Sequence, residues 1–174
     1  MNLSMLHCTS QPAFVGFCRF CGRTVTLLNY ESMKVRMKST VKWIDNVQFV
    51  AETGSGHAVV IDGAPEHGGR NTGPRPMELV LAGAASCTAF DVVLMLNKSR
   101  QKFTRLHVDA EAERADVDPK VFTAIKLTFN IAGIGLDPAA VERAVRLSKE
   151  KYCSATAMLG MTATITTQIV ISDT

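Results

Sequence analysis

The chain has 174 residues, of which 47% are hydrophobic and 20% charged, so it can bury a substantial core in one domain. Its formal charge of +3 comes without a dense block of Lys and Arg interleaved with aromatic residues, which argues against nucleic-acid binding. The five cysteines are not spaced like a secreted disulfide framework, and the first residues lack the features of a secretory signal. These observations predict a cytoplasmic protein with reduced thiols.

Residues 1–32 differ from the rest of the chain because they hold three of the five cysteines and show no sustained hydrophobic period. The pair Cys18 and Cys21 has the spacing of half a zinc site, to which Cys8 or His7 could add a ligand. A four-ligand site normally has a second such pair, and the sequence has none. We therefore predict no metal site here, a disordered extension or incorrectly assigned start over 1–32, and a folded domain over 33–174.

Residues 41–62 have a β-like composition. Residues 41–50 carry Val, Trp, Ile and Phe, residues 53–56 read as a turn, and residues 57–62 form a returning strand. The Gly-rich residues 63–75 that follow are predicted to be a loop. They lack the GxxxxGK[ST] pattern that cradles phosphates, so we predict no nucleotide site and no cofactor there.

A long apolar stretch then predicts a helix in the middle of the fold. Pro76 suits the first turn of this helix, and residues 77–96 are almost wholly apolar. The length approaches that of a membrane span. Glu78, Asp91 and the abundance of Ala and Gly favour a buried helix of a soluble protein instead, with no membrane partner. Cys87 lies in the middle of this helix.

The remaining residues predict a hairpin, helices and a closing strand. Residues 106–113 alternate apolar and polar, as a strand with one wet face does, and residues 121–132 supply its partner. Asp137 is a helix N-cap followed by a first-turn proline, and residues 138–151 have helical spacing. Residues 161–172 are a Thr- and Ile-rich strand. The order of elements predicts an α+β domain.

Three parts of the chain together resemble the OsmC/Ohr family of thiol-dependent hydroperoxide reductases, over roughly residues 41–174. They are the hairpin after the long helix and two motifs, Pro76-Met77-Glu78-Leu79 leading to Ala84-Ala85-Ser86-Cys87, and Ala144 through Lys151-Tyr152-Cys153-Ser154. The resemblance implies an antiparallel sheet with a long buried central helix. It also implies an intertwined homodimer in which the long helices pack back to back and each active site lies at the subunit interface.

The resemblance further implies a redox role in the stress response. Cys87 would be the thiolate that attacks a peroxide O–O bond and becomes a sulfenic acid, and Cys153 would resolve it as a disulfide. Glu78 is a weaker third candidate. The partners would be a small organic hydroperoxide and a dithiol reductant of unknown identity.

The sequence departs from the family's pattern at the residues that activate the first cysteine. In better-known members a glutamate directly follows the proline, where this chain has Met77, and the nearest acid is Glu78. Nine positions separate Glu78 from Cys87, which at about 100° per residue is roughly 900°, or opposite faces of a continuous helix. Glu78 therefore reaches Cys87 only if the helix begins after it, bends near Gly83, or belongs to the partner chain.

The family's activating arginine also has no counterpart, since residues 41–62 contain no arginine. Arg70 and Arg75 are candidate substitutes. Asp91, one turn after Cys87, would place a negative charge where it opposes formation of the thiolate.

Three hypotheses about function stay open at this point. The first is a cysteine-based peroxidase that uses Cys87 and Cys153. The alternative for these two residues is that they are buried thiols with a structural role only. The second is a non-enzymatic dimer that binds a small apolar ligand at its interface. The third, metal ligation by a cysteine with His57 or His67, is disfavoured because single histidines in polar loops are usually solvated.

Overall fold

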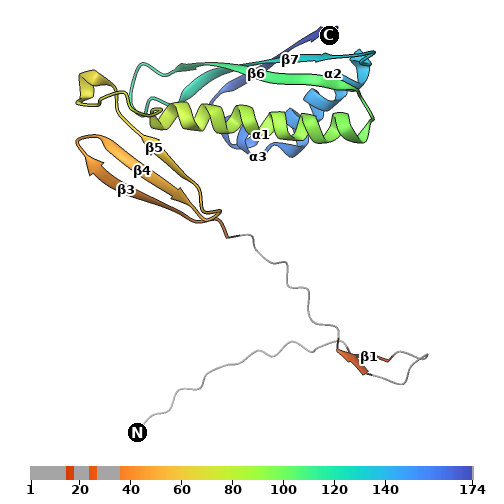
Figure 1. Ribbon diagram of the computed structural model, residues 1–174, viewed down its shortest axis with the longest axis horizontal. Coiled ribbons are helices and arrows are strands. Elements are labelled where there is room, and N and C mark those ends of the chain that lie inside the picture. The colour runs from red at the N-terminus through yellow and green to blue at the C-terminus, as the bar shows by residue number, and fades with distance from the viewer. Residues whose placement is uncertain (1–14, 18–23, 27–35, 174) are drawn as a thin grey trace. The chain divides into compact units, whose positions relative to one another are not determined.

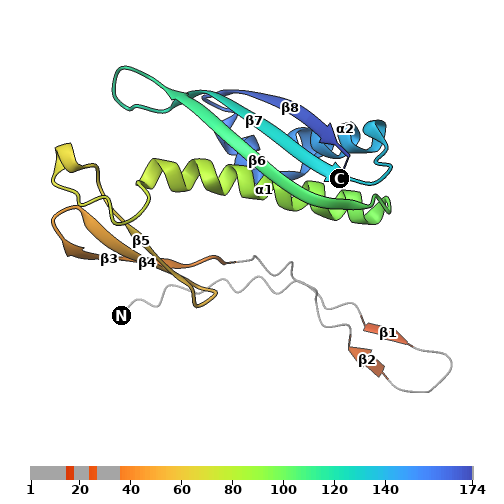
Figure 2. The same ribbon diagram turned by 45° about the horizontal axis from the view of Figure 1, so that its top comes forward.

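The structure is a computed structural model that describes residues 15–17, 24–26 and 36–173, in two compact units that divide between Lys38 and Ser39. In the first unit, β1 (Val15–Phe17) pairs antiparallel with β2 (Thr24–Thr26), as Figure 2 shows. Cys8, Cys18 and Cys21 lie outside the described residues. The extension over 1–32 and its lack of a metal site therefore stay predictions.

The second unit opens with a three-stranded antiparallel meander, β3 (Ser39–Asp45), β4 (Gln48–Thr53) and β5 (Ala58–Ile61). The sequence predicted two strands here, and the structure divides residues 41–50 into two. The division falls at Asn46, whose φ of 46° lies in the left-handed region that asparagine tolerates. The indole of Trp43 donates a hydrogen bond of 2.8 Å to the Asn46 carbonyl and closes this turn.

The loop between the meander and the long helix is organised around Asp62. This side chain is buried, and its carboxylate accepts hydrogen bonds from the N–H groups of Gly63, Arg70 and Thr72 and from the Thr72 hydroxyl, at 2.8–3.1 Å. The bonds from Thr72 are the main cause that lowers the Asp62 pKa to about 2. The loop also contains the short helix η1 (Pro65–His67).

Helix α1 (Pro76–Lys98) is continuous and buries one face only. Ala84, Ala85, Thr88, Val92 and Leu96 are buried, and the apolar ones belong to the hydrophobic core. Its remaining faces expose Val80, Phe90 and Leu94 in the single chain. Among the described residues α1 alone is long and apolar enough to cross a membrane, but core helices of soluble proteins share these properties, and α1 packs on a sheet.

The sheet beneath α1 consists of β6 (Phe103–Arg114), β7 (Phe122–Gly133) and β8 (Thr164–Ser172), in that order. The predicted hairpin of β6 and β7 is confirmed, and every second residue of β6 from Leu106 to Ala112 packs against the core. The β7–β8 pairing is parallel, so the sheet is mixed rather than purely antiparallel. Helical segments separate β7 from β8 and form the crossover that a parallel pair requires.

That crossover contains α2 (Pro138–Leu147), η2 (Ser148–Tyr152) and α3 (Ser154–Leu159), which lie with α1 on one face of the sheet (Figure 1). Asp137 caps α2 as predicted, since its carboxylate accepts a 3.0 Å hydrogen bond from the Ala139 N–H. The predicted helix over 138–151 changes at Ser148 from an α-helix to a π-helical turn. Such turns occur often at functional sites.

Candidate active site

The fold brings the two predicted redox cysteines together although they are far apart in the sequence. Cys87 lies in the middle of α1 and is half-buried, whereas Cys153 directly precedes α3 and is 2% exposed. Burial raises the pKa of the Cys153 thiol, and a hydrogen bond with the Cys87 side chain raises it further. The two thiols are therefore neighbours, one accessible and the other enclosed, and both are reduced in the structure.

Backbone contacts at the start of α3 hold Cys153 in place. Its sulfur accepts a hydrogen bond from the Thr156 N–H at 3.5 Å, and its carbonyl accepts one from the Thr156 hydroxyl at 3.0 Å. Its own N–H donates to the Ser148 carbonyl at 2.9 Å, across the whole of η2. The position of the Cys153 sulfur thus depends on the geometry of η2.

Glu78, the third predicted site residue, is not brought to Cys87 within one chain. Helix α1 begins at Pro76, so Glu78 is inside it, on the face opposite to Cys87. Its carboxylate is exposed, accepts a 2.8 Å hydrogen bond from the Arg75 N–H, and lies 4.0 Å from the Arg75 guanidinium. In the single chain Glu78 therefore caps the helix that carries Cys87.

The two arginines that the sequence suggested as substitutes are engaged elsewhere. Arg70 forms an ion pair with Asp45 of the meander, and Arg75 pairs with Glu78. Met77, which occupies the place of the family's glutamate, packs against the hydrophobic core. No activating group at the family's positions is thus turned toward Cys87 within the described part of one chain.

Sequence reasoning missed one contact beside the thiols. The hydroxyl of the buried Ser148 donates a 3.0 Å hydrogen bond to the Asp91 carboxylate, one turn after Cys87 on α1. In the sequence Ser148 falls at the helical spacing of the buried face of α2, so it read as a small core residue. The change from α-helix to η2 at that residue had no signal in the hydrophobic pattern.

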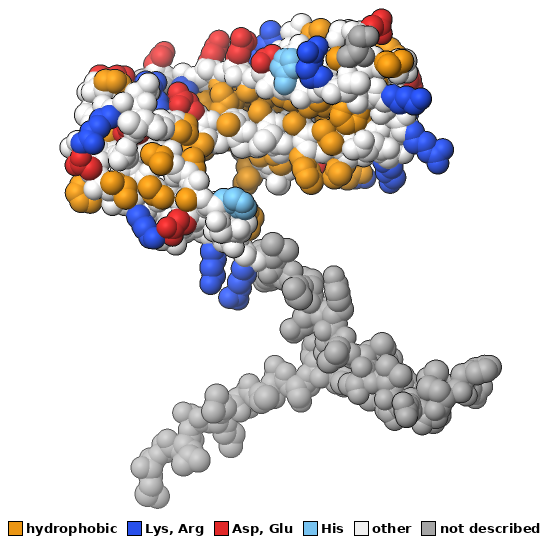
Figure 3. All heavy atoms as spheres, viewed as in Figure 1, with side chains coloured by type: hydrophobic (Ala, Val, Ile, Leu, Met, Phe, Trp, Pro, Cys, Tyr) orange, Lys and Arg blue, Asp and Glu red, His pale blue; other side chains and the backbone are white. Residues whose placement is uncertain are grey.

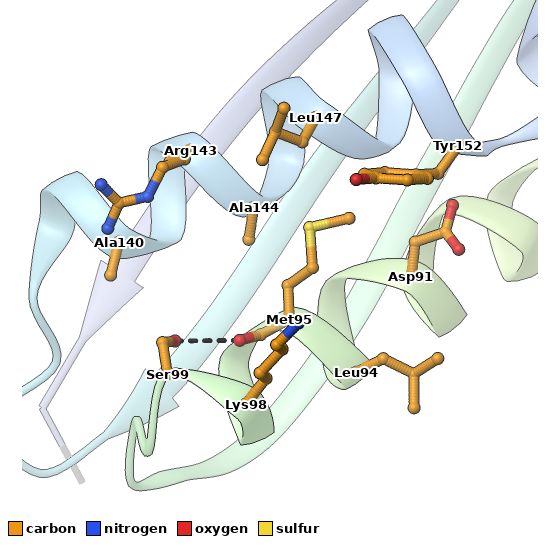
Figure 4. A pocket seen from close by; sticks show the side chains of 10 residues that line it. All are labelled: Asp91, Leu94, Met95, Lys98, Ser99, Ala140, Arg143, Ala144, Leu147 and Tyr152. Atoms are coloured by element: carbon orange, nitrogen blue, oxygen red, sulfur yellow. Dashed lines mark hydrogen bonds between the residues drawn. The ribbon is translucent and has the colours of Figure 1, made fainter.

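A pocket of about 490 Å³ lies between α1 and the α2–η2 segment (Figure 4). Asp91 and Tyr152 border it, and they are close in sequence to Cys87 and Cys153 respectively. Most of its wall is apolar, and Lys98 near the end of α1 and Arg143 on α2 add positive charges (Figure 4). The full lining is Asp91, Leu94, Met95, Lys98, Ser99, Ala140, Arg143, Ala144, Leu147 and Tyr152. The pocket suits a small, largely apolar molecule.

The described residues contain no group of three or more His, Cys, Asp or Glu side chains arranged to hold a metal ion. His57 lies in the turn before β5, where its Nδ1 is 3.2 Å from the Ser55 hydroxyl.

The long helix bearing one thiol, the mixed sheet beneath it and the second thiol before α3 define an OsmC-like α+β protein. Residues 68–168 match the family described as OsmC-like protein. The chain belongs to this family.

Relatives of known sequence or structure agree with that assignment. Protein YhfA of Escherichia coli is 43% identical over 133 residues, which cover 75% of this chain and 94% of that protein. A hypothetical protein from Aquifex aeolicus is 26% identical and superposes with a TM-score of 0.71 over 80% of this chain and 98% of its own. An organic hydroperoxide resistance protein OsmC from Legionella pneumophila shares the fold at 17% identity, with a TM-score of 0.59 over 78% and 97% of the two chains.

Proposed function

We propose that this protein reduces organic hydroperoxides with a pair of thiols, Cys87 as the attacking group and Cys153 as the resolving group. The observation that carries the proposal is the pairing of a half-buried thiol with an enclosed one at a junction of α1 and α3. The organic hydroperoxide resistance named for the Legionella protein, which shares the OsmC-like fold, supports it. The proposed setting is the reducing cytoplasm, where both thiols begin each cycle reduced.

The chemistry proceeds in two steps. The Cys87 thiolate attacks the terminal oxygen of the hydroperoxide, so an S–O bond forms while the O–O bond breaks and the alkoxide leaves to take a proton as the alcohol. Cys153 then attacks the sulfenic sulfur of Cys87. An S–S bond forms, the S–O bond breaks, and the hydroxyl group leaves as water with the proton that the Cys153 thiol gives up. A dithiol returns two electrons to the disulfide and becomes oxidised itself.

The raised pKa of Cys153 supports this division of roles. At neutral pH it keeps Cys153 protonated, and a thiol is a poor nucleophile toward peroxides. Cys153 is also enclosed, so a peroxide meets Cys87 first.

The site is proposed to work in a homodimer. The uncovered part of α1 includes Phe90, 65% exposed, and Leu94, 53% exposed, and Figure 3 shows hydrophobic side chains gathered along this helix. A second copy of the chain would remove this apolar surface from water. The partner subunit would also be a source for the activating groups that one chain does not turn toward Cys87.

The pocket between α1 and the α2–η2 segment favours a second candidate function, the binding of a small apolar ligand without chemistry. Its volume and apolar wall suit such a ligand. The two functions differ in whether the thiols of Cys87 and Cys153 are oxidised during the reaction: a peroxidase oxidises them, and a ligand-binding protein does not.

Turnover measurements test the first proposal. We expect consumption of cumene hydroperoxide in the presence of a dithiol, at a rate well above that of free cysteine. Cys87→Ser should abolish turnover and Cys153→Ser should stop it after one cycle. Ser154 directly follows Cys153 and is exposed, so Ser154→Ala is the matched control and should turn over like wild type. If wild type consumes the hydroperoxide no faster than free cysteine does, the peroxidase proposal is wrong and ligand binding becomes the better account.

A further inference from the structure

Helix α1, which carries Cys87, and the turn η2, which ends directly before Cys153, meet at Ser148. The Ser148 side chain is fully buried, and its hydroxyl lies 3.0 Å from Oδ2 of Asp91 and 3.4 Å from the Thr88 carbonyl oxygen. Thr88 directly follows Cys87, and Asp91 is one turn beyond it on α1. Both contacts of the hydroxyl thus fall within a turn of the attacking thiol.

The backbone of the same residue is tied to the resolving thiol. The Ser148 carbonyl accepts the hydrogen bond of the Cys153 N–H at 2.9 Å, which closes the π-helical turn η2. In a π-turn each carbonyl accepts a hydrogen bond from the residue five positions on, whereas in an α-helix it is four positions on. An α-helix continued past Leu147 would therefore place Cys153 at a different rotation about the helix axis and a different distance along it. Ser148 therefore links the turn around Cys87 to the turn that ends at Cys153.

We propose that Ser148 and Asp91 are positioning residues, whose hydrogen bond holds η2 against α1 so that the Cys153 sulfur can reach the Cys87 sulfenic acid. The inference rests on the proposed function and adds to it the residues that set the rate of the second step. Neither side chain touches the peroxide in this account. Resolution requires the two sulfurs to meet at bonding distance and in line, so a small displacement of η2 slows it strongly.

A single-turnover experiment separates the two steps. Reduced protein is mixed with one equivalent of cumene hydroperoxide, and the Cys87 sulfenic acid is trapped with dimedone and followed by mass spectrometry. Ser148→Ala should form the sulfenic acid at the wild-type rate and Asp91→Ala no more slowly, because a charge that opposes the thiolate is removed. In both variants the lifetime of the sulfenic acid should increase about tenfold to a hundredfold. Asp91→Asn keeps an oxygen acceptor for the Ser148 hydroxyl and should restore fast resolution.

Two controls keep the result specific. Thr104→Val removes a side-chain hydrogen bond of β6, 3.3 Å from the Thr104 hydroxyl to the Ala132 carbonyl oxygen of β7, and should leave both steps unchanged. Thermal unfolding of each variant establishes that it is folded, and Asp91→Ala tests the same bond from the other side if Ser148→Ala does not fold. In a Cys87→Ser background, Ser148→Ala should also make the enclosed Cys153 react faster with iodoacetamide.

The outcomes distinguish this inference from the function on which it rests. If wild type forms neither sulfenic acid nor disulfide, the proposed function fails and the positioning role with it. If wild type turns over and Ser148→Ala resolves at the same rate, the function stands and the positioning role is wrong. If Asp91→Asn resolves as slowly as Asp91→Ala, the charge of Asp91 is required rather than its hydrogen bond, which also overturns the inference.

Discussion

Glu78 and Cys87 lie on opposite faces of one continuous helix, and the Glu78 carboxylate is occupied by the backbone N–H of Arg75 at 2.8 Å. The sequence left three ways for Glu78 to reach Cys87, of which a helix beginning after Glu78 is excluded by the start of α1 at Pro76. Within one chain, the described contacts of Glu78 are those of a helix cap. A catalytic contribution from Glu78 would have to reach the thiol of a partner subunit.

The capping role of Glu78 predicts a modest loss of stability on truncation. We expect Glu78→Ala to lower the free energy of unfolding by about 0.5–1 kcal/mol, because the Arg75 N–H loses its acceptor and the negative charge leaves the N-terminus of α1. Denaturant unfolding at neutral pH measures this change. Glu113→Ala, at an exposed position of β6, should change stability by less, and equal losses in the two variants would contradict the capping role.

Asp62 predicts a pH dependence of stability at acid pH. Its folded pKa of about 2 is below the ordinary value of about 3.9, so its stabilisation is present above pH 4 and is lost as the pH falls toward 2. In Asp62→Asn the side chain has only one acceptor oxygen for the four donors and no longer titrates. The variant therefore lacks the contribution of this residue to the pH dependence of stability. The difference in unfolding free energy between wild type and Asp62→Asn should therefore be largest at neutral pH and shrink toward pH 2. A difference that stays constant over this range would show that the carboxylate charge has no such role.

The exposed face of α1 predicts self-association. Phe90→Asp should shift the protein from dimer to monomer in sedimentation velocity, because a charge replaces an apolar group in the proposed interface. Ile134→Asp, at an equally exposed apolar residue after β7, is the matched control and should leave the dimer intact. Dissociation by both variants, or by neither, would contradict an interface along α1.

Truncation of a buried residue of the sheet should lower the free energy of unfolding by more than the loss of the Glu78 cap does. Phe129 of β7 is fully buried in the cluster between the sheet and the helices, so Phe129→Ala should destabilise the protein by about 3–5 kcal/mol. Val117→Ala, in the exposed turn between β6 and β7, should stay within about 0.5 kcal/mol. Denaturant unfolding followed by circular dichroism measures both.

The elements that the sequence predicted well are those with a clear hydrophobic period. The one-sided alternation of β6 and the apolar length of α1 led directly to the hairpin and the central helix. The turn at Asn46 was missed because its left-handed backbone breaks a run of strand-forming residues without a glycine. The parallel direction of β8 depends on the crossover and not on the composition of the strand.

The candidate site was predictable only in part. The two cysteines were found through motifs, whereas their meeting depends on how η2 turns the chain toward α1, which sequence separation does not encode. The link from Ser148 to Asp91 was invisible because a serine on a helix face reads as a small core residue. Periodicity reports which face of a helix is buried, but it does not report which polar atoms meet there.

The central claim is that Cys87 and Cys153 form a redox pair, and thiol stoichiometry tests it most directly. The full chain with Cys8, Cys18 and Cys21 changed to serine retains only this pair. After one equivalent of cumene hydroperoxide without oxygen, we expect rapid loss of two thiols per chain and a Cys87–Cys153 disulfide in peptide mass spectra. Cys153→Ser in this background should instead accumulate a sulfenic acid on Cys87. Thiol loss at the rate of free cysteine, unaffected by substitution of either residue, would contradict the account.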